Sequence, residues 1–233
     1  MSEVRGAEFW DERYRSSRKL WSGNPNLQLV AEAAGLPPGT ALDAGCGEGA
    51  DAIWLARRGW RVTGTDISSV ALERAAARAA EAGQPVSGRL TWRHADLVAA
   101  SLRRAPDAPP PAGPPGPAES AGTGILQDRY DLISAQYLHL PPEPRAALIR
   151  ALAAAVAPGG TLLVVGHDPS DLQTTVPRPP DPELFSTAGD MAALLDPAAF
   201  EIIASEARPR EVTDPEGRPA TIHDAVLRAR RRA

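Results

Sequence analysis

Three glycines alternate with other residues directly after a short apolar run, in the segment Thr40-Ala-Leu-Asp-Ala-Gly-Cys-Gly-Glu-Gly-Ala50. The segment predicts a strand, a glycine turn and a helix, an arrangement that binds nucleotides in doubly wound folds because Gly lets backbone N–H groups approach the ligand. An acid, Asp66, ends the next β-prone run 21 residues after Gly45. There its carboxylate can accept hydrogen bonds from both hydroxyls of a ribose. The two features together predict a site for a ligand that contains ribose.

The identity of that ligand depends on the spacing of the glycines. Dinucleotide sites usually have the pattern Gly-x-Gly-x-x-Gly, whereas this turn reads Gly-x-Gly-x-Gly and is preceded by an acid, Asp43. A carboxylate at Asp43 would repel a pyrophosphate and would suit a ligand with a positive charge, such as the ammonium and sulfonium of S-adenosylmethionine. A nicotinamide-dependent oxidoreductase is the alternative that uses the same strand, turn and acid. Asp43 could also simply cap the glycine turn.

The segment Leu42-Asp-Ala-Gly-Cys-Gly-Glu-Gly-Ala-Asp-Ala52 resembles the first motif of class I S-adenosylmethionine-dependent methyltransferases. Asp66-Ile67 is similar to the ribose-binding motif of that family, His94-Ala-Asp96-Leu97 to its adenine motif, and Tyr130–Tyr137 to the motif beside the methyl group. The resemblance implies cofactor contacts by Trp21, Asp43, Gly45, Cys46, Gly47, Asp66, Ile67, Asp96, Leu97 and Gln136.

The resemblance also covers other parts of the chain. Pro158-Gly-Gly-Thr-Leu-Leu-Val is similar to the entry to the family's fifth strand, and two N-terminal segments, 9–14 and 21–26, are similar to segments that close over the cofactor in the small-molecule branch. Within that branch the chain looks most like the tellurite-resistance and thiopurine methyltransferase-like group. The branch implies methyl transfer to a thiol, chalcogen or hydroxyl group of a small molecule by in-line displacement.

Candidate acceptor residues follow the later strands. His139 and His167 each come after an expected strand, where ligands of such sheets bind, and a neutral histidine can take or steer a proton near pH 7. His223 and His94 fall within expected strands and are not assigned to the chemistry. We expect substrate contacts by Trp10, Tyr14, Tyr137, Arg210 and Arg218.

Each of these residues also has a purely structural interpretation. Trp10 and Trp21 are large aromatic residues that commonly pack in a core, and Asp96 could cap a loop. Cys46 has no histidine near it in the sequence, so we do not expect it to act as a nucleophile. The run Ser134-Ala-Gln-Tyr137 differs from the Asn/Asp-Pro-Pro-Tyr sequence of enzymes that methylate amide or adenine nitrogens, which argues against bases of nucleic acids as substrates.

Short β-prone runs alternate with helical stretches, which predicts a Rossmann-like, doubly wound α/β fold. We expect a mostly parallel sheet of seven strands with an antiparallel C-terminal edge strand and a hairpin around 214–217. The expected strands are Thr40–Ala44, Arg61–Asp66, Leu90–Ala95, Tyr130–Ala135, Thr161–Gly166, Phe200–Ala207 and Ile222–Ala229. The expected helices are Asn26–Ala34, Ala50–Arg58, Ser69–Ala82, Pro144–Ala157 and Asp190–Leu195.

The chain reads as a single methyltransferase domain over residues 1–233. Residues 1–36 are expected to supply helices that close over the cofactor. The segment 105–124 consists almost entirely of Pro, Gly and Ala, and we expect it to be a disordered insertion because it has too few apolar side chains to order itself. A docking motif for a partner is the alternative interpretation of this segment.

Composition excludes several classes of protein. The net charge of −4 gives no electrostatic footprint for nucleic acid, the single cysteine rules out an internal disulfide, and no apolar run approaches the ~20 residues that cross a membrane. With no signal-peptide pattern at the N-terminus, we expect a cytoplasmic protein that acts on a small molecule. A protein that binds the cofactor without catalysis remains a second alternative.

Overall fold

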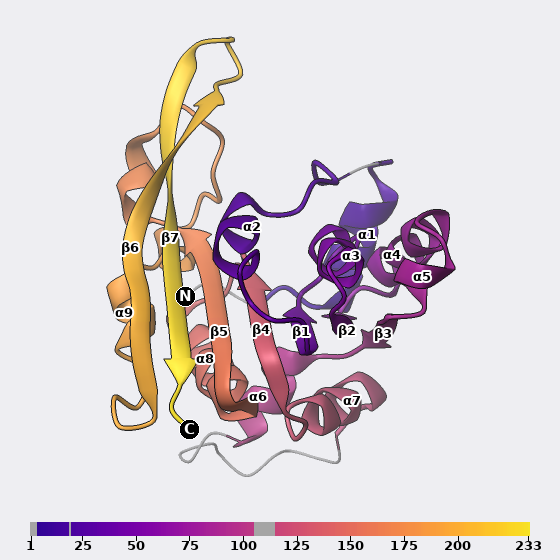
Figure 1. Cartoon of the computed structure of the whole chain (residues 1–233). Coiled ribbons are helices and arrows are strands. Elements are labelled where there is room, and N and C mark those ends of the chain that lie inside the picture. Colours follow the sequence, from indigo (N-terminus) through magenta and orange to yellow (C-terminus); the bar gives the residue numbers. More distant parts are fainter. Residues whose placement is uncertain (1–3, 19, 105–114) are drawn as a thin grey trace.

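The computed structural model describes residues 4–18, 20–104 and 115–233. Its seven strands form one sheet in the order β3-β2-β1-β4-β5-β7-β6 (Figure 1). They are β1 (Thr40–Ala44), β2 (Arg61–Asp66), β3 (Leu90–His94), β4 (Tyr130–Gln136), β5 (Val156–His167), β6 (Phe200–Thr213) and β7 (Pro219–Arg231). Strands β1 to β5 pair in parallel, and β7 is antiparallel to both β5 and β6. The predicted fold class is confirmed.

Helices cover both faces of this sheet (Figure 1). The α-helices are α1 (Ala7–Arg15), α2 (Leu27–Ala33), α3 (Ala50–Arg57), α4 (Ser69–Glu81), α5 (Gln84–Ser87), α6 (Leu97–Arg104), α7 (Pro117–Ile125), α8 (Pro142–Ala155) and α9 (Ala188–Ala192). Two 3₁₀ turns, η1 (Pro169–Gln173) and η2 (Pro182–Leu184), lie between β5 and α9. Each of the five predicted helices overlaps an observed helix, but the predicted bounds are wrong for two of them. Helix α8 ends at Ala155 because β5 begins at Val156, and α9 ends at Ala192. Ser68 caps α4 by accepting a hydrogen bond from Ala71 N.

The core follows the two-residue period of the central strands. Leu132 and Leu163 face α2 and α3, whereas their chain neighbours Ile133 and Leu162 face α6, α8 and α9. All four side chains are fully buried. Strand order reverses between β1 and β4, and ligands of doubly wound sheets bind beyond the carboxyl ends of the strands at such a switch point.

The C-terminal strands form a long ribbon. The predicted strands end at Ala207 and begin at Ile222, whereas pairing of β6 with β7 continues out to Thr213 and Pro219. Pairing of β7 with β5 stops at Asp224, so the far half of the ribbon projects past the sheet (Figure 1). The predicted hairpin is confirmed, because the N–H of Gly217 donates to the Asp214 carbonyl at 3.0 Å to close its turn.

The segment predicted to be a disordered insertion, residues 105–124, is partly helical, so that prediction is wrong for its second half. Residues 105–114 lie outside the described residues, and α7 begins at Pro117, a residue that suits the first turn of a helix. Buried Ile125 and Leu126 anchor its end in the core. Gly122 lets α7 approach α6, because a Cβ atom there would lie 2.6 Å from the Asp96 carbonyl oxygen.

None of the helices in the described ranges combines the length and the apolar character that crossing a bilayer requires.

The close approach of α7 gives a direct test of the packing. We expect Gly122→Ala to lower the free energy of unfolding by about 1–3 kcal/mol, because the new methyl group would overlap the Asp96 carbonyl. Gly124→Ala is the matched control in the same helix. A Cβ atom at Gly124 meets nothing within 4 Å, so this change should leave stability unchanged or raise it by ~0.5–1 kcal/mol. Equal urea midpoints for the two variants would contradict this packing.

Candidate active site

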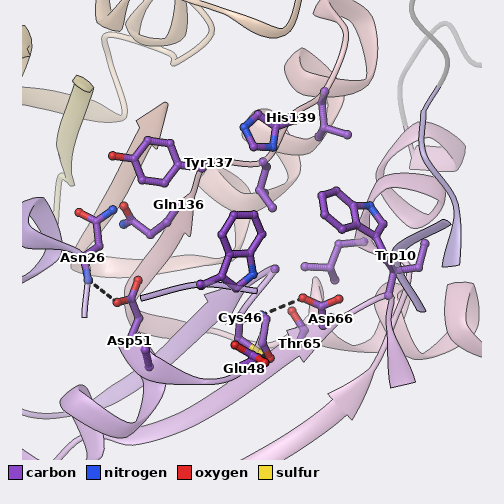
Figure 2. A pocket seen from close by; sticks show the side chains of 18 of the residues that line it. Trp10, Asn26, Cys46, Glu48, Asp51, Thr65, Asp66, Gln136, Tyr137 and His139 are labelled. Carbon is purple, nitrogen blue, oxygen red and sulfur yellow. Dashed lines mark hydrogen bonds between the residues drawn. The ribbon is translucent and has the colours of Figure 1, made fainter. Parts of the chain in front are cut away.

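A cavity of about 610 Å³ lies at the carboxyl ends of the parallel strands. Its walls come from the segments that follow β1, β2, β3 and β4, and from the N-terminal residues that precede β1. In the view of Figure 2, Asp66 and Trp10 lie toward one end, and Asn26, Asp51 and Tyr137 lie toward the other. The cavity therefore occupies the place where the switch point predicts a ligand.

The glycine turn forms the floor of the cavity. Gly45 and Gly47 have φ angles of +72° and +51°, which a side chain would strain. A Cβ atom at Gly47 would lie 2.9 Å from the Tyr14 hydroxyl oxygen, and one at Gly45 would overlap Leu138. The alternating glycines thus have two effects. They allow backbone φ angles that a side chain would strain, and they keep the cavity open beside the main chain.

Two acids line the cavity on either side of this turn. Asp66 accepts hydrogen bonds from Gly47 N at 2.8 Å and from Ser68 N at 2.9 Å, and Asp51 accepts one from Asn26 N at 2.6 Å. Burial raises the pKa of Asp66, and it raises the pKa of Asp51 to about 6. The donors of these hydrogen bonds are neutral backbone groups, so the two buried carboxylates favour a positively charged ligand.

A third acid lies behind the turn. Asp43 is 2% exposed, and its Oδ2 atom finds no hydrogen-bond partner among the described residues. Burial, together with the neighbouring charge of Asp51, raises the pKa of Asp43 well above its ordinary value. Asp43 is not part of the cavity wall, so the structure does not support the predicted cofactor contact of its side chain, and Asp43 lies next to the cavity only through the glycine turn that follows it.

The N-terminal segment is tied across the cavity by hydrogen bonds. Arg78 donates to the carbonyl oxygens of Glu48 at 3.2 Å and of Gly23 at 3.0 Å, so one side chain of α4 joins this segment to the glycine turn. Arg74 similarly donates to the Tyr14 carbonyl oxygen at 2.6 Å. Trp21 Nε1 donates to the Tyr14 hydroxyl at 2.9 Å, which places the two aromatic rings above the turn.

The other end of the cavity is formed by residues that follow β4 and by His167, the last residue of β5. Tyr137 has a φ angle of +50°, an uncommon conformation for a residue with a side chain, and its N–H donates to the Val165 carbonyl at 2.7 Å. The ring of His167 lies between those of Tyr137 and His139, with centroid distances of 4.8 Å and 5.2 Å. This end of the cavity therefore presents a wall of flat rings.

Both histidines of this wall are neutral at physiological pH. Nε2 of His139 and Nδ1 of His167 are buried without a hydrogen-bond partner in the described part of the chain. Burial and the charges of Arg5 and Arg13 lower the pKa of His139 to about 4, and burial and the proximity of His139 do the same for His167. With such pKa values, the rings can donate or accept hydrogen bonds but are weak bases.

The structure brings most of the predicted site residues together. The cavity is lined by Trp10, Tyr14, Trp21, Gly45, Cys46, Gly47, Asp66, Ile67, Asp96, Leu97, Gln136, Tyr137, His139, His167 and Arg210. Asp96 also caps α6, because its Oδ1 accepts a hydrogen bond from Ala99 N at 2.8 Å. Burial raises the pKa of the Cys46 thiol, so no reactive thiolate is expected there.

Arg218, for which the sequence predicted a substrate contact, is not part of the cavity wall. Arg218 lies in the turn of the projecting ribbon, away from the cavity, and its side chain is 62% exposed. It pairs there with Asp214 at 2.7 Å and with Glu216 at 2.9 Å. The sequence predicted shorter strands, which would have kept this turn near the end of β5.

Three acids in the cavity wall were not predicted from the sequence: Glu48, Asp51 and Asp224. Asp51 stands in the first turn of α3, where an acid is common because of the helix dipole, so its type alone did not distinguish it. Asp224 lies within β7 and is 1% exposed. A charged residue between the apolar residues Ile222 and Val226 was the available signal for a buried functional group.

Comparison with protein families identifies the type of domain. A family model described as "Methyltransferase domain" matches residues 14–206, which include the glycine turn, Asp66 and both histidines of the aromatic wall.

Individual relatives agree with this match. An uncharacterized methyltransferase of Mycobacterium tuberculosis is 36% identical over 148 residues, 62% of this chain and 59% of its own length, so the chain spans less than two thirds of that relative. A ubiquinone biosynthesis O-methyltransferase of Marinobacter nauticus is 29% identical over 215 residues, 91% of this chain and 76% of its own. A solved structure described for the conversion of a disulfide bond into a thioacetal group during echinomycin biosynthesis has a TM-score of 0.70 at 25% identity, covering 97% of this chain and 91% of that one.

The state of the two histidines can be measured directly. We expect the imidazole NMR signals of His139 and His167 to show the neutral form down to about pH 4, because burial disfavours the cation. His139→Gln and His167→Gln assign the signals. Unfolded histidines titrate near 6.5, so the unfolded chain binds more protons and stability should fall as the pH drops from about 6.5 to 4. Titration of either ring near pH 6.5 in the folded protein would contradict this description.

Proposed function

The chain belongs to the methyltransferase domain family, and on that basis we propose that it transfers a methyl group from S-adenosylmethionine to a small-molecule acceptor. The observation that carries the proposal is the cavity beyond β1 and β2, in which a glycine turn lies between Asp51 and Asp66. This cavity, with acids on either side of the turn, suits an adenosyl ligand that bears an ammonium group and lacks phosphates.

The residues of the cavity fit this cofactor. Asp66 would accept the ribose hydroxyls, since its carboxylate lines the cavity and is held in place by hydrogen bonds from the backbone N–H groups of Gly47 and Ser68. Asp96 and Leu97 would hold the adenine, and the backbone of residues 45–47 together with Gln136 would hold the methionine part. When bound, S-adenosylmethionine supplies a methyl group that is activated by its sulfonium.

Charge supports the same orientation of the cofactor. The ammonium group would lie near Asp51, because this carboxylate lines the cavity at the end away from Asp66 (Figure 2). Trp21 and Tyr14 would cover the bound cofactor, since both rings already lie above Gly47. Covering excludes water, which strengthens these electrostatic contacts.

The acceptor would bind against the wall formed by Tyr137, His139 and His167, with Trp10 across the cavity. A base with a pKa of about 4 is too weak to remove a proton from an ordinary alcohol, so the histidines would orient the acceptor through hydrogen bonds. The acceptor atom itself would therefore be acidic or polarizable, as in a thiol, a selenol or a phenol. Alignment of this atom with the methyl group would supply most of the rate.

Membership of the tellurite-resistance and thiopurine-like group is part of this proposal. It is supported by the N-terminal segments 9–14 and 21–26 and by a thiopurine S-methyltransferase of Bordetella petrii, which is 39% identical over 71 residues, 29% of this chain. The O-methyltransferase of Marinobacter nauticus matches a longer part of the chain, so both sulfur and oxygen acceptors belong in the test.

The proposal is tested by turnover. We expect S-adenosylhomocysteine to accumulate, as measured by mass spectrometry, when the protein is mixed with S-adenosylmethionine and a panel of thiols, phenols and chalcogen oxyanions. Asp66→Asn should weaken cofactor binding about 10- to 100-fold because it removes a charged acceptor. Asp131→Asn is the matched control, since Asp131 accepts its hydrogen bonds from Thr40 at the opposite end of the sheet.

Other outcomes of this experiment contradict the proposal in distinguishable ways. Cofactor binding without turnover on the whole panel would indicate a non-catalytic binding protein. Binding of NAD in place of both adenosyl ligands would indicate a nicotinamide-dependent oxidoreductase.

Cofactor affinity should depend on pH through Asp51. The ionised carboxylate attracts the ammonium group, and its pKa is about 6 in the free protein, so protonation below that pH should weaken binding by up to about tenfold per pH unit. Calorimetric titrations with S-adenosylhomocysteine between pH 5 and 8 measure this slope. Asp51→Asn should bind weakly with a flatter profile. A wild-type affinity that is unchanged between pH 5 and 8 would refute this role of Asp51.

A further inference from the structure

Asp224 is a buried carboxylate in the cavity wall to which no role has yet been given. It lies in β7 opposite His167 of β5 and is 1% exposed. Four hydrogen bonds from three elements end on its two oxygen atoms. A buried charge with this number of donors is expensive to desolvate, and it holds its partners in one geometry.

The strongest partner of Asp224 is Arg210 of β6. Nε of Arg210 donates to Oδ2 at 3.1 Å and Nη2 donates to Oδ1 at 3.1 Å, which is the two-pronged geometry of a guanidinium on a carboxylate. Tyr137 donates its hydroxyl proton to Oδ1 at 2.6 Å, and Gln28 Nε2 donates to Oδ2 at 3.1 Å. The four side chains form one fixed array at the acceptor end.

This array leaves part of the guanidinium available to a ligand. Nη1 of Arg210 makes no hydrogen bond within the described residues, and Arg210 lines the cavity. Its charge is already balanced by Asp224, so the remaining N–H groups suit an oxygen atom of a neutral carbonyl as well as that of a carboxylate. Nη2 of the same guanidinium lies 3.4 Å from the Tyr137 hydroxyl, and the ring of Tyr137 lies against that of His167.

A purely structural role for Asp224 would be to join α2 to the ribbon, and a neighbouring carboxylate already does this. Glu32 of α2 pairs with Arg208 at 2.5 Å and with Arg228 at 3.0 Å, and it is not part of the cavity wall. The ribbon therefore carries two acid–arginine clusters of the same kind, and the one that faces the cavity is centred on Asp224.

We propose that Asp224 is a positioning residue for the acceptor: it fixes Arg210 so that the guanidinium binds an oxygen atom of a flat, aromatic acceptor that stacks on Tyr137 and His167. The inference rests on the proposed function and specifies its substrate class. The acceptor carries a carbonyl or carboxylate oxygen on its ring system, apart from the atom that receives the methyl group.

Binding of small phenols tests this without turnover. The probes are 4-hydroxyacetophenone, which carries a ring carbonyl, 4-isopropylphenol, which has a similar shape without it, and 4-hydroxybenzoate, which carries a carboxylate. We expect calorimetry on the protein saturated with S-adenosylhomocysteine to show about tenfold tighter binding of at least one oxygen-bearing probe than of 4-isopropylphenol. The order of the two oxygen-bearing probes distinguishes a neutral from an anionic acceptor.

Variants assign the preference to the array. Asp224→Asn should abolish the tighter binding of the oxygen-bearing probe. Arg210→Lys should also abolish it, because an ammonium group keeps the charge but not the two-pronged geometry. Glu32→Gln, the matched control, should retain the wild-type preference. Thermal melting and the affinity for S-adenosylhomocysteine show that each variant is folded, and Arg210→Lys supplies the test if Asp224→Asn does not fold.

Three results would overturn the inference: equal affinity of wild type for all three probes, no binding of any of them, or an unchanged preference in both array variants. Failure of the proposed function looks different. In that case the wild-type protein would not bind S-adenosylhomocysteine, whereas probe binding can still be measured on the free protein.

Discussion

Buried negative charge at the glycine turn is the constraint on which the rest of the site depends. Asp43 and Asp66 lie near the ends of β1 and β2, and Asp51 lies in the first turn of α3. Burial raises the pKa of each carboxyl group. Asp51 and Asp66 accept hydrogen bonds from backbone N–H groups, which stabilise a carboxylate without neutralising it. A ligand with a positive charge lowers the free-energy cost of burying these carboxylates, whereas a pyrophosphate would raise it. The chemistry of the cofactor follows from this arrangement more directly than from the fold.

The N-terminal segment, which would cover the cofactor in the proposed function, is attached to that same turn by hydrogen bonds. Arg78 reaches both Glu48 and Gly23, and Asp11 of α1 accepts the Ser68 hydroxyl at 2.6 Å directly after β2. Ser68 and Arg78, which hold the N-terminal segment, belong to the N-cap and the last turn of α4, the helix that follows Asp66. If the N-terminal segment covers the cofactor as proposed, a ligand that shifts the turn or Asp66 would also move this segment, because the same contacts hold both.

Much of the fold and of the cofactor end could be predicted from sequence, because both depend on local patterns. Strand periodicity located the seven strands, and glycine spacing located the turn. Helix α7 was missed because its burial rests on a long-range contact between Gly122 and Asp96, which composition does not reveal. Arg218 was misplaced for a related reason, since the length of the ribbon is set by pairing of two strands and not by the sequence of either.

The acceptor end was less predictable because its residues come from distant parts of the chain. Asp224 and Gln28 are 196 residues apart and meet only when α2 packs beside β7. His139 and His167 were found from their positions after strands, but their neutral state depends on burial, which a sequence does not show. Sequence patterns within single elements therefore predict the cofactor end of the cavity, whereas the acceptor end depends on contacts between elements that are far apart in the sequence.

A crystal structure of the protein with S-adenosylhomocysteine tests the central claim most directly. The account predicts ribose hydroxyls within hydrogen-bond distance of the Asp66 carboxylate and the ammonium group beside Asp51, with the thioether sulfur facing Tyr137 and His167. Density for the ligand outside the 610 Å³ cavity, or in it with the ribose away from Asp66, would contradict the account.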